Sequence, residues 1–423
     1  MKPTSLTKKL RLGGLLTVSA LLLAGCAGSV GDTAGAADRG ASVEPGASKE
    51  EYAEALADME PVELTFQAAS SATGGNGARD TAFAEAIEEW SDGKISVEVL
   101  FGYPIVAPSE VASALQDGRL DLGYEIPQYA PSEYPAIAEL VNLQSSGGSG
   151  SAVSDFVNVA ATAEVAWNTP EIQSNYEAMG VTPLVPVEAE FSHVAMCTDQ
   201  ADSADELNGA VISAGAPDLL QMIESIGASG TSLPYTELYE GLQRGVINCA
   251  VNGLKVGMAT GVSEVAPHIV APQDGSLGRS TAALLAGGQW DDLPLAAQQL
   301  IYDQLEVYIN GQFEVSTRDY LAAMDDFSGG FHTVDDETEE ALDATVEALR
   351  EDVESSDALD GTKLIADYDA AQEKWTQIVE ELGYEDNGNW SDFAENLDGE
   401  SIDFSPLAER MMEEIYLEHR PAE

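Results

Sequence analysis

Basic residues are scarce in this chain. Its 423 residues include 18 lysines and arginines against 74 aspartates and glutamates, so the formal charge is −56. A surface of this sign repels nucleic acids and anionic lipids, and we exclude a function that depends on binding either. In concentrated salt the Debye length is short, and the carboxylates repel one another less. We therefore interpret the acidic excess as a solvated surface and not as a cation-binding site.

Histidine is scarce as well, which limits catalysis and metal binding. The four histidines have no spacing typical of a zinc site, and no acidic run fits a calcium-binding loop. Residues 147–151 lack the final glycine of the GxSxG turn that presents a nucleophilic serine. We therefore expect no metal, no cofactor and no catalytic residue. The competing interpretation is a hydrolase that uses a cysteine near His193.

Apart from its N-terminal segment, the sequence has no apolar run of 18 residues. In that segment, basic residues at positions 2, 8, 9 and 11 precede the apolar stretch 12–22, and Leu23-Ala24-Gly25-Cys26 follows. This order resembles a bacterial lipoprotein signal. We predict that residues 1–25 are removed and that Cys26 is lipidated; an ordinary secretory signal or a short membrane anchor is the alternative. Residues 26–60 are rich in small and acidic residues and are expected to form a flexible tether.

Only two other cysteines, Cys197 and Cys249, are present. Both lie in predicted strands, and disulfides persist outside the cytoplasm. A bond between them would close a loop of about 50 residues and stabilise the fold by about 4 kcal/mol in the chain-entropy model. Two free buried thiols are the alternative.

Two similar units, each predicting a helix, a glycine and a strand, mark the two halves of the chain. Leu115-Gln116-Asp117-Gly118 leads into a strand over 120–126, and Leu242-Gln243-Arg244-Gly245 leads into a strand over 246–251. In open α/β sheets ligands bind beyond the carboxyl ends of the strands. We therefore expect Glu125–Tyr129 and Asn252–Lys255 to face one another across a cleft.

A glycine-rich loop between a predicted strand (62–68) and a predicted helix (80–90) is a third candidate for ligand binding. Gly75-Asn76-Gly77 lacks the third glycine of a dinucleotide-binding fingerprint, so we do not expect NAD. Exposed backbone N–H groups at a helix start, with Asn76 and Arg79 beside them, can still hold a polar or anionic group. From residue 293 onward the sequence is mostly helical.

Several of these segments resemble one known family. GKISVEVLFG (93–102), ALQDGRLDLGY (114–124), PSEYP (131–135), DELNG (205–209) and SEVAP (263–267) are similar to the extracytoplasmic solute receptors of tripartite ATP-independent periplasmic (TRAP) transporters, of the dicarboxylate-receptor type. The resemblance implies an α/β, two-domain periplasmic-binding-protein-like fold with crossing strands, a long inter-domain helix and a helical C-terminal region. Domain I would comprise residues 61–190 and 268–325, and domain II residues 191–267 and 326–423.

The resemblance also indicates which residues bind ligand. The family's carboxylate-binding arginine is replaced by Ser213, and a second arginine of the family corresponds to Ser192. Either Arg79 or Lys255 supplies the missing cation, or the ligand is not a simple carboxylate. Asn252 aligns with an asparagine that contacts ligand in this family.

Four further residues complete the candidate ligand site. Gln128 and Tyr129 belong to the strand-end loop of the first half. Glu125, from the same region, would favour a cationic or hydroxyl-rich ligand. Trp167 is either an apolar wall of the site or part of the core.

The sequence therefore predicts a non-enzymatic, lipid-anchored solute-binding protein on the extracytoplasmic face of a bacterial cell membrane. It would capture a small polar molecule, which is a carboxylate or, given the missing arginines, neutral or cationic. It would pass this molecule to the membrane subunits of a TRAP-type permease. The alternatives are a lipid-anchored hydrolase and the binding component of another importer or of a sensor.

We expect membrane attachment to depend on Cys26. The natural protein should remain with the membrane fraction after a salt wash, whereas Cys26→Ala should appear in the soluble fraction because it has no thiol to lipidate. Immunoblotting of the washed fractions measures this difference. A Cys26→Ala protein that stays with the membranes would contradict the lipid anchor.

Overall fold

The computed structural model describes residues 42–422, except residues 73, 148, 149, 274, 276, 387 and 398–400. The leader, the expected lipidation site Cys26 and the expected tether up to residue 41 lie outside the described residues. The expectation of a flexible tether is wrong for its last part, because the helix α1 (Lys49–Ala55) buries Tyr52 and packs against the helices Gly77–Trp90 and Leu295–Asp303. None of the helices in the described part of the chain combines the length and the apolar character needed to cross a membrane.

The first of two sheets has the strand order β2-β1-β3-β10-β4. Its strands are β1 (Val62–Ala68), β2 (Ile95–Phe101), β3 (Leu122–Glu125), β4 (Thr182–Ala189) and β10 (Thr281–Ala286). β1 is parallel to β2 and β3, whereas β10 runs antiparallel to β3 and β4. The helices between these strands are α2 (Gly77–Trp90), α3 (Val111–Gln116), α4 (Pro135–Gln144), α5 (Ala152–Asn168) and α6 (Pro170–Met179).

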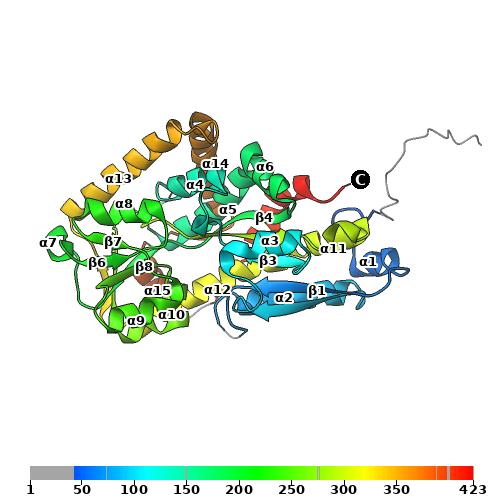
Figure 1. Cartoon of the computed structure of the whole chain (residues 1–423), viewed down its shortest axis with the longest axis horizontal. Coiled ribbons are helices and arrows are strands. Elements are labelled where there is room, and N and C mark those ends of the chain that lie inside the picture. Colours follow the sequence, from blue (N-terminus) through cyan, green and yellow to red (C-terminus); the bar gives the residue numbers. More distant parts are fainter. Residues whose placement is uncertain are drawn as a thin grey trace, which may run out of the picture. The chain divides into compact units, whose positions relative to one another are not determined.

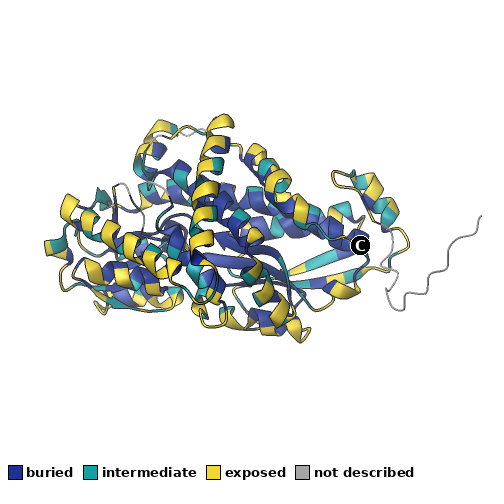
Figure 2. Ribbon diagram, turned by 90° about the horizontal axis from the view of Figure 1, so that it is seen from above, coloured by how far each residue is buried: buried dark blue, intermediate teal, exposed yellow. Residues whose placement is uncertain are grey.

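The second sheet has the order β11-β9-β5-β8-β6-β7. Its strands are β5 (Val194–Cys197), β6 (Val211–Ser213), β7 (Ser229–Thr231), β8 (Cys249–Asn252), β9 (His268–Ala271) and β11 (Gly330–Thr333). The helices between them are α7 (Ala204–Leu207), α8 (Pro217–Ser225), α9 (Leu238–Gln243) and α10 (Leu254–Thr260). The central strands of both sheets are largely buried, whereas the edge strands β2, β7 and β11 are partly exposed. The outer faces of the surrounding helices are exposed (Figure 2).

Both predicted glycine turns are present. Gly118 and Gly245 have φ values of +77° and +67°, which is the left-handed conformation that glycine adopts without strain. The strand after Gly245 begins later than expected: β8 starts at Cys249, whereas the predicted strand started at Val246. Val246 is 59% exposed and belongs to the turn, so its apolar character did not indicate a buried strand position.

The chain after β10 is mostly helical, as predicted, and β11 is a strand within this part. It begins with α11 (Leu295–Asp303) and the long helix α12 (Leu305–Asp326), which packs against both α2 and α10 (Figure 1). Gly311 allows this close approach, because a Cβ atom there would lie 2.8 Å from Cγ of Arg79. α12 therefore contacts elements of both halves.

The C-terminal region comprises α13 (Asp336–Glu354), α14 (Gly361–Glu381), α15 (Trp390–Leu397), α16 (Ser405–Met411) and a π-helical turn (Met412–Tyr416). We expected residues 326–423 to complete the second domain. α13 packs against α8 of that half, but α14 packs along α5, and α15 and α16 pack against α12. Most of this region therefore lies against helices associated with the first sheet.

Two segments cross between the sheets: residues 190–193, from β4 to β5, and residues 277–280, which lead into β10. Asp155 of α5 is fully buried and binds both segments. Its carboxylate accepts hydrogen bonds from the backbone N–H and the hydroxyl of Ser192 (2.8 and 2.9 Å) and from Nη2 of Arg279 (2.9 Å). It also accepts a bond from the indole N–H of Trp390 (2.9 Å). We call these four residues the Asp155 network.

An aromatic cluster surrounds this network. The ring of Trp390 stacks on Phe191 with their centroids 5.4 Å apart, and Phe156 meets Phe404 edge to face at 5.1 Å. Tyr320 of α12 lies 4.9 Å from Trp390 and donates its hydroxyl proton to the carbonyl of Ser192 (2.9 Å). The C-terminal region thus contributes to the packing of the first crossing segment.

The structure joins Cys197 and Cys249 in a disulfide. The two residues are directly opposite each other in the antiparallel pair β5 and β8, which brings their side chains together on one face. The bond closes a loop between residues 52 positions apart. It links the strand that leaves the first crossing segment to the strand that ends at Asn252.

We expect the Asp155 network to stabilise the fold strongly. Asp155→Asn should lower the free energy of unfolding by about 3–5 kcal/mol, because Arg279 loses its buried carboxylate partner. Trp390→Phe removes one hydrogen-bond donor from that carboxylate and should lower it by about 1–2 kcal/mol. Urea denaturation followed by circular dichroism measures both changes.

Trp90→Phe is the matched control, because Trp90 is half-buried on α2, outside the aromatic cluster. It should change the free energy of unfolding by less than about 0.5 kcal/mol. Equal stability of Asp155→Asn and the natural protein would show that the network does not hold the crossing segments.

Candidate functional site

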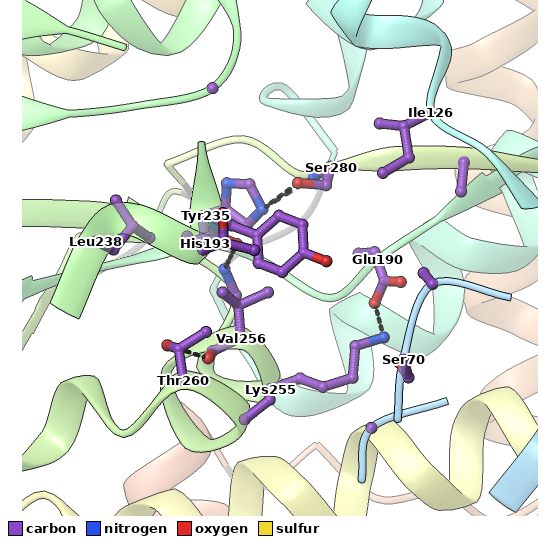
Figure 3. Close-up of a pocket in the computed structure, with 18 of the residues that line it drawn as sticks. Ser70, Ile126, Glu190, His193, Tyr235, Leu238, Lys255, Val256, Thr260 and Ser280 are labelled. Atoms are coloured by element: carbon purple, nitrogen blue, oxygen red, sulfur yellow. Dashed lines mark hydrogen bonds and ion pairs between the residues drawn. The ribbon is translucent and has the colours of Figure 1, made fainter. Parts of the chain in front are cut away.

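A cavity of about 430 Å³ lies where elements of the two sheets meet. From the first half it is lined by the loop before α2 and by the residues that follow β3. From the second half it is lined by the end of β6, the end of β8 and the first turns of α10. Its floor includes both crossing segments, through Glu190, His193 and Ser280 (Figure 3). Its volume is in the range typical of sites for small organic ligands.

The structure places most of the predicted ligand residues on the wall of this cavity. They are Asn76, Gln128, Tyr129, Ser213, Asn252 and Lys255. The loops that follow the two glycine turns therefore do meet at one site. Their convergence follows from the paired helix-glycine-strand units, because both units direct their strand ends toward the cavity.

Arg79 does not line the cavity. Its guanidinium is buried beneath the wall, where it donates to Glu188 (2.6 Å), to Gln312 (2.6 Å) and to Asp80 (2.9 Å). It also lies over the ring of Tyr308, 3.9 Å from the centroid. The expectation that Arg79 binds a ligand carboxylate is therefore not met, because its side chain is fully buried and already forms ion pairs with Asp80 and Glu188.

Glu125, Ser192 and Trp167 also lie away from the cavity wall. Glu125 is buried and accepts a hydrogen bond from the backbone N–H of Ala112 (2.7 Å), and burial raises its pKa to about 7. Ser192 belongs to the Asp155 network. Trp167 is part of the core, where it stacks on His419 with the rings 4.3 Å apart. These three residues have structural partners in place of a ligand.

Lys255 of α10 is the cation on the cavity wall. Its ammonium group donates to Oδ1 of Asn76 (2.9 Å), across the cavity, and forms an ion pair with Glu190 (Figure 3). Glu190 also accepts a hydrogen bond from the hydroxyl of Tyr124 (3.1 Å). Burial alone would raise the pKa of Glu190, but Lys255 and, more weakly, Arg79 lower it below its usual value. Glu190 is therefore ionised at neutral pH, and the pair has no net charge.

His193 also lines the cavity, although the sequence analysis did not assign it to the ligand site. Its Nε2 accepts a hydrogen bond from the backbone N–H of Ser280 (3.0 Å), and burial lowers the pKa of the His193 imidazole to about 3. The ring is therefore neutral and fixes the two crossing segments to one another. Glu190 was missed as well. The sequence contained one indication of its role: Glu190 lies two residues after Glu188 and directly follows an apolar strand.

The remaining wall is mostly apolar and aromatic. Tyr124, Ile126, Tyr235, Leu238 and Tyr320 are among its residues. No group of three or more histidine, cysteine or acidic side chains in the described part of the chain is arranged to hold a metal ion. The site can therefore bind a small molecule through a few polar groups and an apolar surface.

The sequence matches the profile of the bacterial extracellular solute-binding proteins, family 7, over residues 66–358. Among solved structures, a TRAP solute-binding protein from Rhodoferax ferrireducens in complex with benzoate has a TM-score of 0.65 and 16% identity, covering 75% of this chain and 99% of that one. A TRAP periplasmic solute-binding protein from Bordetella bronchiseptica with bound mandelate has a TM-score of 0.62 and 20% identity, covering 74% and 99%.

A third such protein, from Chromohalobacter salexigens with bound D-glucuronate, has a TM-score of 0.60 and 18% identity, covering 73% and 99%. No curated protein sequence matches significantly. The structural likenesses support the two-sheet fold, and the family profile spans both sheets, the crossing segments and the cavity wall. The chain therefore belongs to family 7 of the bacterial extracellular solute-binding proteins, the extracytoplasmic solute receptors of TRAP transporters, which are not enzymes.

Proposed function

We propose that the protein captures a small polar molecule in the cavity between its two sheets and delivers it to the membrane subunits of a TRAP-type permease. The observation that carries this proposal is the cavity itself, in which polar groups from both halves converge. Asn252 and Ser213 belong to one half, and Asn76 and Gln128 to the other. A ligand held by both halves favours closure of the cleft, as expected for a receptor that must distinguish loaded from empty states.

The lipid anchor is part of the same proposal. The order of basic residues, apolar stretch and Leu-Ala-Gly-Cys supports attachment through Cys26. An anchored receptor would remain near its permease on the extracytoplasmic face of the membrane. The strongly acidic surface would keep the tethered protein soluble and away from anionic lipid headgroups.

The ligands of the solved relatives indicate a size range. Benzoate, mandelate and D-glucuronate, which are bound in three of those structures, are small organic molecules that a cavity of about 430 Å³ can accommodate. We infer a ligand of similar size here. The functional groups of this ligand must differ from those of benzoate, mandelate and D-glucuronate to the extent that the residues of this cavity wall differ from those of the relatives.

We expect Asn252 to contact the ligand. Its Oδ1 accepts the backbone N–H of Gly253 (2.9 Å), which directs the amide group at the end of β8. Asn252→Ala should weaken binding about tenfold or more, because the ligand loses one hydrogen bond. Isothermal titration of residues 27–423 with hits from a thermal-shift screen measures this change.

Asn168→Ala is the matched control, since Asn168 is exposed at the end of α5. Neither substitution should alter the melting temperature of the ligand-free protein appreciably. An unchanged dissociation constant for Asn252→Ala would remove this residue from the site. Failure of every small polar compound to stabilise the natural protein would contradict the proposed function, because ligand at about 100 times its dissociation constant adds about 2.7 kcal/mol.

A further inference from the structure

We propose that Glu190 determines specificity: by neutralising Lys255 it makes the cavity select uncharged polar ligands and reject simple carboxylates. This inference rests on the proposed function and specifies the class of ligand. It depends on which charges reach the cavity wall, on how they are paired, and on which polar groups remain available to a ligand.

Two charged side chains belong to the described wall, and they are bound to each other. The side chains of Lys255 and Glu190 are 10% and 14% exposed, so the pair is largely shielded from water. A ligand carboxylate at Lys255 would lie beside the carboxylate of Glu190. At this degree of burial the repulsion between two carboxylates is weakly screened, and it opposes the attraction of the single ammonium group.

The charges beneath the wall do not change this balance. Arg79 forms buried ion pairs with Asp80 and with Glu188. Arg279, which precedes the wall residue Ser280, forms a buried ion pair with Asp155. Carboxylates therefore outnumber cations in this region, even when the layer behind the wall is included. Ser213, at the position of the family's arginine, adds no charge, and its hydroxyl accepts the backbone N–H of Leu233 (3.2 Å).

A cationic ligand is disfavoured for a different reason. Both oxygens of Glu190 already accept hydrogen bonds, one from Lys255 and the other from Tyr124. An added ammonium group at Glu190 would lie beside the ammonium group of Lys255, and the repulsion between two cations is weakly screened in a mostly buried site.

An uncharged ligand meets neither obstacle. Lys255 has three N–H donors and uses two of them, on Asn76 and Glu190. The third, together with the amide of Asn252 and the hydroxyl of Ser213, can bind the carbonyl or hydroxyl groups of a neutral molecule. Ile126 and Leu238 provide apolar surface for its carbon skeleton. We therefore infer a neutral amide, alcohol or polyol with an apolar part.

Matched compounds test this inference on the whole mature protein. Benzoate, benzamide and benzylamine share one ring and differ in charge, and so do mandelate, mandelamide and the corresponding amino alcohol. Isothermal titration at pH 7 should give at least tenfold tighter binding of the amide than of the acid or the amine in each series. Equal or tighter binding of the acid or of the amine would overturn the inference while leaving the proposed function intact.

Glu190→Gln tests the cause. The substitution preserves the shape of the side chain but removes its charge and one of its two acceptor oxygens, which leaves Lys255 without its counter-charge. The ratio of acid to amide affinity should therefore rise at least tenfold. Glu164→Gln is the matched control, because Glu164 is paired with Lys374 (2.9 Å) outside the cavity; it should leave the ratio unchanged.

The comparison of acid with amide on the natural protein does not depend on how well Glu190→Gln folds. An unchanged ratio in a folded Glu190→Gln protein would overturn the role of Glu190. If no neutral, acidic or cationic compound bound the natural protein, the proposed function would fail and this inference with it.

Discussion

The carboxylate of Asp155 is buried, and burial of a charge is unfavourable unless donors compensate for it. Here the donors come from three distant parts of the chain: Ser192, Arg279 and Trp390. The two crossing segments are therefore fixed to α5 at one point, and the C-terminal region is fixed to the same point. The position of each sheet relative to Asp155 therefore depends on the backbone path of the two crossing segments between this residue and the strands.

The cavity depends on the same segments. Glu190 and His193 flank Phe191 and Ser192, so the first crossing segment presents two of its side chains to the cavity and one to Asp155. Tyr320 connects these roles directly, since it lines the cavity and donates to the carbonyl of Ser192. Rotation of one half against the other would therefore alter the surroundings of the Lys255 and Glu190 pair.

Local patterns in the sequence predicted what is determined locally. The strand Val62–Ala68 has the predicted bounds, and the glycine turns directed two strand-end loops to one cavity. Arg79 failed as a prediction because its partners are far away in the sequence; Glu188 and Gln312 are 109 and 233 positions distant. The pairing of Glu190 with Lys255 likewise follows from the crossing of the chain between sheets, which no local pattern contains.

The position of Trp390 has an optical consequence. Its indole is stacked on Phe191 and bonded to Asp155, so its surroundings are set by the first crossing segment and by α5 together. Indole fluorescence responds to local polarity and to nearby charge. The first crossing segment is one of the connections between the two halves. The closure proposed for ligand capture would change the surroundings of Trp390, so the fluorescence of this indole could follow movement of the cleft in the unlabelled molecule.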